Sequence, residues 1–301
     1  MNSAANYQGI VVSAYGGFYQ VRVNDSGQEL TCKARGRLKK SFQAIYPGDR
    51  VTVSAGGADT PMIEQIEPRL NRLPRPRIVN LQQALLVMAV AEPAYDVTLL
   101  DKMLVTCHIN NVQPLICFNK LDLLQPAGRP QFDAAVDSYR KAGLTVYTLS
   151  ALYGDELSLL LPHFAHKLTV LAGPSGVGKS SLLNRLLPGH NAQVGAISQR
   201  LNLGKHTTRQ VSILPIGSGL IADTPGFALL DLPPELTAEQ LAAHYPDFAA
   251  FAVACRFEGC QHHREPDCAV KRAVEQGEIS ERRYAGYLRL HEELRQRRKN
   301  R

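Results

Sequence analysis

Alternation of apolar and polar residues dominates the first part of the chain. Runs with this two-residue period lie at 9–14, 18–23, 49–53 and 62–66, separated by glycine, asparagine and proline. A period of two places every second side chain on one face of a strand, and frequent turns favour hairpins. The pattern predicts a small antiparallel barrel of the OB type over 1–68. A basic, proline-rich stretch at 67–77 follows, where we expect an extended connector.

The middle of the chain alternates apolar runs with amphipathic stretches. Strands are predicted at 84–90, 114–118 and 144–149, and helices at 97–109 and near 131–142. Asp96 is placed to cap the first helix, because its carboxylate can accept from unpaired amides. Strands that alternate with helices form a mainly parallel sheet covered on both faces. We therefore expect an α/β domain over 69–235.

Helical patterns return in the last part of the chain. Thr237 is a candidate cap for a helix over 238–251, and a cation-rich helix is expected over about 280–298. The region 236–301 is therefore predicted to be a mainly α-helical domain. A chain of 301 residues with 45% hydrophobic content is long enough for three such domains with cores of their own.

A glycine-rich segment joins a predicted strand at 168–172 to a predicted helix. It reads Gly173-Pro174-Ser175-Gly176-Val177-Gly178-Lys179-Ser180-Ser181. In a G-x-x-x-x-G-K-S loop, backbone amides and a helix N-terminus surround a β-phosphate, the lysine meets the β- and γ-phosphate oxygens and the serine hydroxyl meets Mg²⁺. The segment predicts a nucleoside triphosphate site. The loop alone does not indicate which base the nucleotide carries, because the same loop also suits a nucleotide kinase or a transport-type ATPase.

A second motif, Asn119-Lys120-Leu121-Asp122, follows the strand at 114–118 and indicates which base is bound. An aspartate can accept from both N1–H and N2–H₂ of guanine, whereas adenine has no such donor pair on that edge. The asparagine can contact the N7/O6 side, and the lysine stem can lie along the purine. Ser150-Ala151-Leu152, after the next strand, can offer a backbone N–H to the guanine oxygen. GTP is therefore the predicted nucleotide.

Two further stretches suggest hydrolysis. The polar segment 193–210 is typical of a switch loop in which a threonine completes the Mg²⁺ shell, with Thr208 as first and Thr207 as second candidate. In Asp223-Thr224-Pro225-Gly226 the carboxylate can hold Mg²⁺ through water and the Gly226 amide can meet the γ-phosphate. Phe227 stands where Ras-like GTPases carry a water-orienting glutamine. His206 is the nearest polar substitute, and an ordinary surface position or a contact to a partner is the alternative interpretation.

The motifs occur in an unusual order. In a Ras-like GTPase the phosphate loop comes first and N-K-x-D much later, but here residues 119–122 precede 173–181 and residues 223–226 come last. One site can still form, because the strands need only be neighbours in the sheet. The order therefore indicates a circular permutation.

Three of the six cysteines gather near the C-terminus in the pattern C-x₄-C-x-H-x₅-C, formed by Cys255, Cys260, His262 and Cys268. Three thiolates and one imidazole can close a tetrahedral Zn²⁺ shell, and four protein ligands indicate a structural site. His263 is the alternative ligand. No secretory leader and no apolar run of about twenty residues is evident, so a cytoplasmic protein is expected. In the cytoplasm, a cluster of cysteines and histidine favours metal binding over disulfide bonds.

The net charge of +7 and pI of about 9.1 favour a polyanionic partner. Five cations fall within 33–40, and Tyr15, Phe18, Tyr19 and Phe42 are available for stacking, a combination that suits RNA. The arginines of the last helix are a second candidate RNA contact. For both regions an ordinary solvated surface is the alternative interpretation.

Taken together, N-K-L-D, G-P-S-G-V-G-K-S-S, G-K-H-T-T-R, D-T-P-G-F and C-x₄-C-x-H-x₅-C resemble the circularly permuted RsgA family, the small ribosomal subunit biogenesis GTPases of bacteria, over nearly the whole chain. The resemblance implies an OB-fold domain, a permuted GTPase domain and a zinc domain. It implies GTP hydrolysis stimulated by the small (30S) ribosomal subunit late in its maturation, with 16S rRNA contacts. It also supports His206 as the water-positioning residue. One departure is Gln82, where family members often carry an aspartate.

These inferences define the candidate site. The candidate GTP-binding residues are Asn119, Lys120, Leu121, Asp122, Ser150, Ala151, Gly173, Pro174, Ser175, Gly176, Val177, Gly178, Lys179, Ser180, Ser181, Thr208, Asp223 and Gly226. Ser180 and Thr208 are the candidate Mg²⁺ ligands, and the resemblance supports Cys255, Cys260, His262 and Cys268 as the Zn²⁺ ligands. We expect a monomer without a membrane partner. A kinase or ATPase, which would prefer ATP, and an RNA-binding module whose nucleotide site is only structural remain as alternatives.

Overall fold

The structure is a computed structural model that describes residues 5–36, 38, 44–55, 60–73, 77–153, 156–188, 211–223 and 232–299. The chain divides into two compact units. The first comprises Met1–Gln83, Ser158–Leu171 and Leu186–Phe227, and the second comprises Ala84–Leu157, Ala172–Arg185 and Ala228–Arg301.

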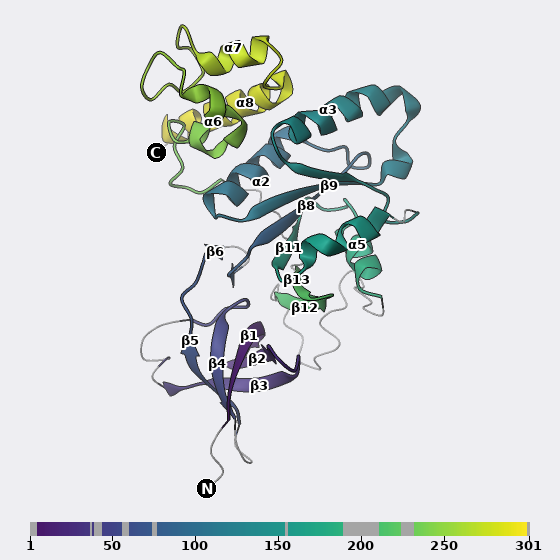
Figure 1. Cartoon of the computed structure of the whole chain (residues 1–301), viewed down its shortest axis with the longest axis vertical. Coiled ribbons are helices and arrows are strands. Elements are labelled where there is room, and N and C mark those ends of the chain that lie inside the picture. The colour runs from purple at the N-terminus through teal and green to yellow at the C-terminus, as the bar shows by residue number, and fades with distance from the viewer. Residues whose placement is uncertain are drawn as a thin grey trace. The chain divides into compact units, whose positions relative to one another are not determined.

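A closed five-stranded barrel lies in the first unit (Figure 1). Its strands are β1 (Ala5–Tyr15), β2 (Phe18–Val23), β3 (Glu29–Ala34), β4 (Arg50–Ala55) and β5 (Met62–Ile66), in the order β1-β2-β3-β5-β4. Alternate side chains such as Val11, Val21 and Ile63 are fully buried in its core. The predicted OB-type barrel is thus confirmed. The barrel is not wholly antiparallel, however, because β3 and β5 pair in parallel.

The connector after the barrel contains a short hairpin of β6 (Arg72–Leu73) and β7 (Ile78–Val79). Gln82 follows it and forms two bonds with the main chain of Leu168. Its side-chain Oε1 accepts from the backbone N–H of Leu168 at 2.6 Å, and its backbone N–H donates to the Leu168 carbonyl at 3.1 Å. Glutamine at this position therefore supplies the acceptor for that amide.

A six-stranded sheet has the order β10-β9-β8-β11-β13-β12. Its strands are β8 (Gln83–Ala89), β9 (Gln113–Asn119), β10 (Thr145–Thr148), β11 (Leu168–Ala172), β12 (Ser212–Ile216) and β13 (Gly219–Asp223). Every residue of β8 and β11 is buried, as expected for strands covered on both faces. β9 and β10 pair in parallel, as do β11 and β13, whereas β12 is an antiparallel edge strand. The predicted mainly parallel sheet is confirmed.

Helices accompany these strands. They are α2 (Val97–Ile109), α3 (Arg129–Lys141), α4 (Leu161–Phe164), α5 (Lys179–Leu186), α6 (Pro246–Ala252), α7 (Ala269–Glu275) and α8 (Glu281–Lys299). The predicted cap is present, because Asp96 Oδ1 accepts from the amides of Thr98 at 2.8 Å and Leu99 at 3.3 Å. Among the described residues, no helix is both long enough and apolar enough to span a membrane.

The single helix predicted over 238–251 is wrong. The structure instead has a 3₁₀ turn at Leu241–His244 followed by α6, and Tyr245 between them has an extended backbone with φ −116° and ψ 87°. The reason is Pro246. Proline has no amide to donate, and its ring disfavours helical backbone at the preceding residue, so a helix ends before it and a new one begins at it.

Within the second unit, Arg283 holds α8 against α2. Its guanidinium bonds to Asp101 on α2 and pairs with Asp247 on α6 at 3.0 Å, and all three side chains are at most 8% exposed. Burial raises the pKa of Asp101 to about 6, although Arg283 opposes this shift. The helices are also very close, since a Cβ built on Gly286 would lie 1.9 Å from Asp101 Oδ2.

Replacing Arg283 with leucine is expected to destabilise the packing of α8 by about 3–5 kcal/mol, because two buried carboxylates would lose their cation. The measurement is the denaturant dependence of amide hydrogen exchange in α8. Arg295→Leu on the same helix is the matched control. Its 3.6 Å pair with Glu292 is exposed to solvent, so a much smaller loss than for Arg283→Leu is expected there. Equal losses in the two variants would contradict the role of the buried ion pairs.

Candidate nucleotide site and metal centre

The glycine-rich loop lies between β11 and α5, as predicted. Gly173, Gly176 and Gly178 have φ values of 151°, 81° and 93°, a backbone region that favours glycine. A Cβ on Gly173 would lie 2.1 Å from the Val87 carbonyl oxygen, and one on Gly178 would lie 2.3 Å from Asn119 Nδ2. The first and last of these glycines are therefore required by space as well as by backbone conformation.

Lys179 is the first residue of α5, and its Nζ donates to the carbonyls of Gly173 and Pro174, each at 2.7 Å. The ammonium group therefore lies against the loop's own backbone, where it can offset the charge of a bound phosphate. Val177 is buried beneath the loop. The exposed residues of the loop and of the first turn of α5 are Ser175, Gly176, Ser180 and Ser181.

Asn119, at the end of β9, joins the predicted base-reading motif, residues 119–122, to the glycine-rich loop. Its side chain is almost fully buried, with Nδ2 donating to the Val177 carbonyl and Oδ1 accepting from the Ala151 amide, both at 2.8 Å. We predicted that the Asn119 amide would contact the guanine N7/O6 side and that the 150–152 backbone would offer an N–H to the guanine oxygen. In the structure Asn119 bonds to the Ala151 amide and to the loop, so it holds three segments of the site together, and the Leu152 amide donates to Ser150 Oγ at 3.3 Å.

Beside this junction lies a pocket of about 200 Å³. It is lined by Asn119, Lys120, Asp122, Leu123, Ser150, Ala151, Leu152, Gly178 and Ser181. Ser150 Oγ donates to Asp122 Oδ1 at 2.5 Å and so orients the carboxylate. The carboxylate retains further acceptor positions, because each oxygen has two lone pairs. Leu123 was not predicted, since an apolar residue next to a motif carries no chemical signal of its own.

The remaining predicted residues are distributed as follows. Leu121 begins a 3₁₀ turn at Leu121–Leu123, and Asp223 is the last residue of β13. Outside the described residues lie His206, Thr207, Thr208, Thr224, Pro225, Gly226 and Phe227.

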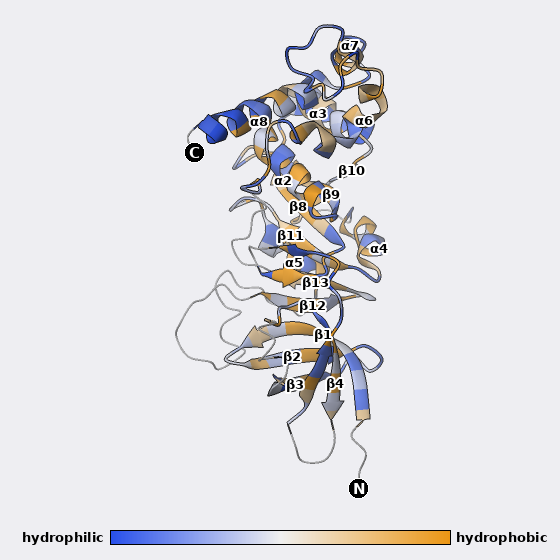
Figure 2. Ribbon diagram, turned by 90° about the vertical axis from the view of Figure 1, so that its left-hand side faces the viewer, coloured by the Kyte–Doolittle hydropathy of each residue, from blue (hydrophilic) through white to orange (hydrophobic). Residues whose placement is uncertain are grey.

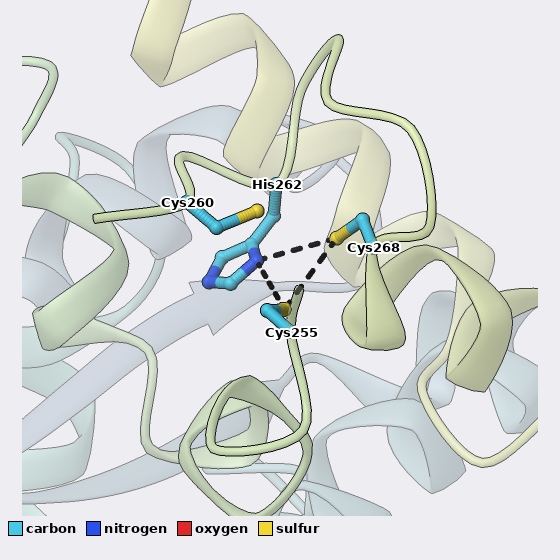
Figure 3. A group of neighbouring side chains, drawn as sticks. All are labelled: Cys255, Cys260, His262 and Cys268. Atoms are coloured by element: carbon cyan, nitrogen blue, oxygen red, sulfur yellow. Dashed lines mark hydrogen bonds between the residues drawn. The ribbon is translucent and has the colours of Figure 1, made fainter. Parts of the chain in front are cut away.

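A cluster of Cys255, Cys260, His262 and Cys268 forms a candidate metal centre in the second unit, and their ligand atoms all lie within 4.8 Å of one another. Figure 3 shows the four side chains directed toward a common point. The distance from Cys255 Sγ to Cys268 Sγ is 3.9 Å, and His262 Nδ1 lies 3.6 Å and 3.4 Å from these sulfurs. A tetrahedron with Zn–S bonds of about 2.3 Å has edges of about 3.8 Å. The donor set therefore fits a four-coordinate metal site.

Hydrogen bonds fix the backbone around the cluster. Tyr284 on α8 donates to the His262 carbonyl at 2.8 Å, and Glu265 accepts from the amides of Gln261, His263 and Arg264 at 2.9–3.0 Å. Burial raises the pKa of Glu265, but these amides outweigh it and lower the pKa to about 2. His262, rather than the alternative His263, belongs to the cluster.

The barrel carries aromatic side chains that suit base stacking. Tyr15 and Phe18 face one another across β1 and β2 and are 49% and 43% exposed, and Lys33 Nζ lies 5.1 Å from the Phe18 ring centre. An exposed aromatic surface beside a cation can bind single-stranded RNA through stacking and charge together. Tyr19 is half-buried and therefore less accessible than Tyr15 and Phe18. Arg37, Phe42 and residues 39–40 lie outside the described part of the chain.

The arginines of α8 are less available for RNA than their number suggested. Arg283 is buried, and Arg297 donates to the carbonyls of Leu232, Pro233 and Leu236 at 2.7–3.4 Å. These two residues hold the helix in place. The last turns of α8 remain strongly hydrophilic (Figure 2), with Arg298 and Lys299 exposed.

Comparison with known sequences gives matches along nearly the whole chain. Residues 8–63 match the family model described as RsgA N-terminal domain, and residues 66–233 match the one described as RsgA GTPase. A small ribosomal subunit biogenesis GTPase RsgA from Bacillus pumilus is 41% identical over 96% of this chain and 98% of that protein. The protein of the same name from Bacillus subtilis is 39% identical over the same shares.

Two crystal structures have the same fold. That of YloQ, a circularly permuted GTPase, superposes with a TM-score of 0.84 at 36% identity, covering 97% of this chain and 96% of that one. That of YjeQ from Thermotoga maritima superposes with a TM-score of 0.85 at 32% identity, covering 96% and 99%.

Proposed function

The chain belongs to the RsgA family of GTPases, and on this premise we propose that it hydrolyses GTP to GDP and phosphate on the small ribosomal subunit, late in the maturation of that subunit. The observation that carries the proposal is the bond from Asn119 Nδ2 to the Val177 carbonyl. It joins the motif that selects guanine to the loop that binds phosphate, although the two are inverted in sequence order.

The predicted site residues have distinct roles in this reaction. Asp122 accepts from guanine, Lys120 covers the purine face and Lys179 offsets the charge on the transferred phosphate. Ser180 and Thr208 would supply oxygen ligands of the kind that Mg²⁺ prefers, and Asp223 would hold Mg²⁺ through water. Mg²⁺, when bound, would neutralise the charge developing between the β- and γ-phosphates.

The attacking water requires a residue to orient it. We propose His206 for this role, because Phe227 has no polar group and a neutral imidazole can accept a hydrogen bond from water. The loop that carries Gly226 would meet the γ-phosphate.

The flanking regions bind the ribosome in this proposal. We assign 1–68 to an RNA-binding barrel, 69–235 to the GTPase domain and 236–301 to a domain held by one structural Zn²⁺. The exposed pair Tyr15 and Phe18 would contact 16S rRNA. The protein would act as a monomer in the cytoplasm, where ribosomal subunits mature.

The decisive test is GTP turnover with and without isolated small ribosomal subunits. A clear acceleration by small but not large subunits is expected, with ATP hydrolysed poorly under both conditions. Turnover that stays at background with small subunits would favour an RNA-binding module with a structural nucleotide site. A preference for ATP would favour a kinase or ATPase.

Replacing Asp122 with asparagine should shift the preference from GTP to xanthosine triphosphate by about a hundredfold, because the asparagine Nδ2 donates to the 2-oxo group of xanthine but faces the N2–H₂ donor of guanine. The asparagine Oδ1 can still accept from Ser150, so the pocket should keep its shape. The measurement is the ratio of the two affinities. Asp133→Asn, which changes an exposed pair with Arg129, is the matched control. An unchanged ratio in the Asp122 variant would refute the assignment.

A further inference from the structure

The segment between β8 and α2, residues 90–96, holds the lysine of the base-reading motif. Val90 N donates to the Asn119 carbonyl at 2.9 Å, and Lys120 Nζ donates to the Glu92 carbonyl. Glu92 and Lys120 both have left-handed backbone, with φ of 52° and 61°. Residues other than glycine adopt this conformation only where surrounding contacts stabilise it. The segment and the lysine are therefore fixed together.

The same segment is attached to the C-terminal helix. The Tyr95 ring packs edge-on against Phe118 of β9, with 5.2 Å between ring centres. Its hydroxyl accepts from Arg282 Nη1 of α8 at 3.0 Å. Pro93, between these anchors, lies beside the phosphate loop, because a Cβ on Gly176 would be 3.5 Å from Pro93 Cδ. A residue of α8 thus contacts the segment that carries the partner of Lys120.

We infer that Tyr95 and Arg282 are positioning residues for guanine recognition. Arg282 fixes the Tyr95 hydroxyl, Tyr95 fixes the segment 90–96, and the Glu92 carbonyl then holds the Lys120 ammonium so that the lysine stem borders the base pocket. The inference rests on the proposed function and adds a contribution of α8 to nucleotide affinity, although no residue of α8 lines the pocket.

The physical basis is preorganisation. A lysine side chain has many rotamers, and ordering it when a ligand binds opposes binding. Here the Lys120 ammonium already has a carbonyl partner, so the side chain loses less rotamer freedom when the nucleotide binds. Loss of the Arg282 contact should release this restraint without detaching α8, because Lys102 and Glu293 still pair at 2.8 Å and Arg283 keeps its buried carboxylates.

The experiment is a double-mutant cycle in the full-length chain, read as the Kd for GDP. Tyr95→Phe and Arg282→Leu are each expected to weaken GDP binding about fivefold, and the two together should do no more than either alone. In a Lys120→Ala background neither change should have any further effect. Arg298→Gln, which removes an exposed pair with Glu239 on the same helix, is the matched control and should leave the Kd unchanged.

Two results would overturn the inference. One is an unchanged Kd in Tyr95→Phe and Arg282→Leu. The other is the same loss in the Lys120→Ala background as in the wild type, which would mean that the pair affects the fold rather than the lysine. Failure of the proposed function would be seen separately, as a wild-type chain that binds ADP as tightly as GDP.

Discussion

The Lys179→Ala variant is expected to hydrolyse GTP about a thousandfold more slowly than the wild type in the presence of small ribosomal subunits. The Lys179 ammonium is held by two carbonyls of its own loop, each at 2.7 Å. A cation fixed in this way needs no rearrangement when charge develops on the phosphates, and it stabilises the transition state more than the ground state. Its loss therefore lowers kcat as well as affinity.

Phosphate release and nucleotide affinity are the two measurements for this variant. Lys141→Ala, at the exposed end of α3, removes the same charge outside the site and should leave both unchanged. Lys179→Arg should also be nearly inactive, because a planar guanidinium cannot replace a compact ammonium between these carbonyls. Turnover of Lys179→Ala within tenfold of the wild type would contradict the assigned role.

The motifs of the site could be predicted from the sequence because their chemistry is local. The glycines of the loop, the lysine and the aspartate each have a function that depends on residue type and spacing. The role of Asn119 could not be predicted in the same way. Its buried amide bonds to Val177 and Ala151, and these partners are distant in sequence and meet only in the folded sheet.

The elements of the fold that depend on neighbouring residues could likewise be predicted from the sequence. Periodicity identified α2 and its Asp96 cap, because both depend on neighbouring residues. It missed β3, which ends at Ala34 just inside the basic run 33–40. It also missed the parallel pairing of β3 with β5, which joins strands distant in sequence. The helix predicted over 238–251 was wrong because the apolar pattern was followed across Pro246.

The arginines of α8 show most clearly what the sequence alone could not predict. In the sequence all six appear equivalent, and a cation-rich helix indicates a surface for RNA. In the structure Arg283 is enclosed between two carboxylates and Arg297 caps three carbonyls. Which arginine is buried depends on where Asp101 and Asp247 lie, and that is a property of the tertiary structure alone.

Removing the proposed zinc is expected to unfold the segment between α6 and α7, and so to weaken ribosome-stimulated GTP turnover while leaving basal turnover intact. The segment has little regular structure, and His262 and Asp267 have left-handed backbone with φ of 53° each. A structural zinc contributes about 10–16 kcal/mol in small zinc domains, enough to offset the ordering of such a segment. The Cys268→Ala variant should therefore lose its metal and the hydrogen-exchange protection of α7.

His263→Ala is the matched control, because His263 adjoins His262 but is not part of the cluster. It should retain one zinc per chain by elemental analysis and keep α7 protected. In Cys268→Ala the basal GTP turnover should persist, since no member of the cluster lines the base pocket. Stimulation by small subunits should fall at least about tenfold, because we assign this region to ribosome binding. A Cys268→Ala variant that keeps α7 protected would show that packing against Tyr287 and Phe248, and not the metal, orders this segment.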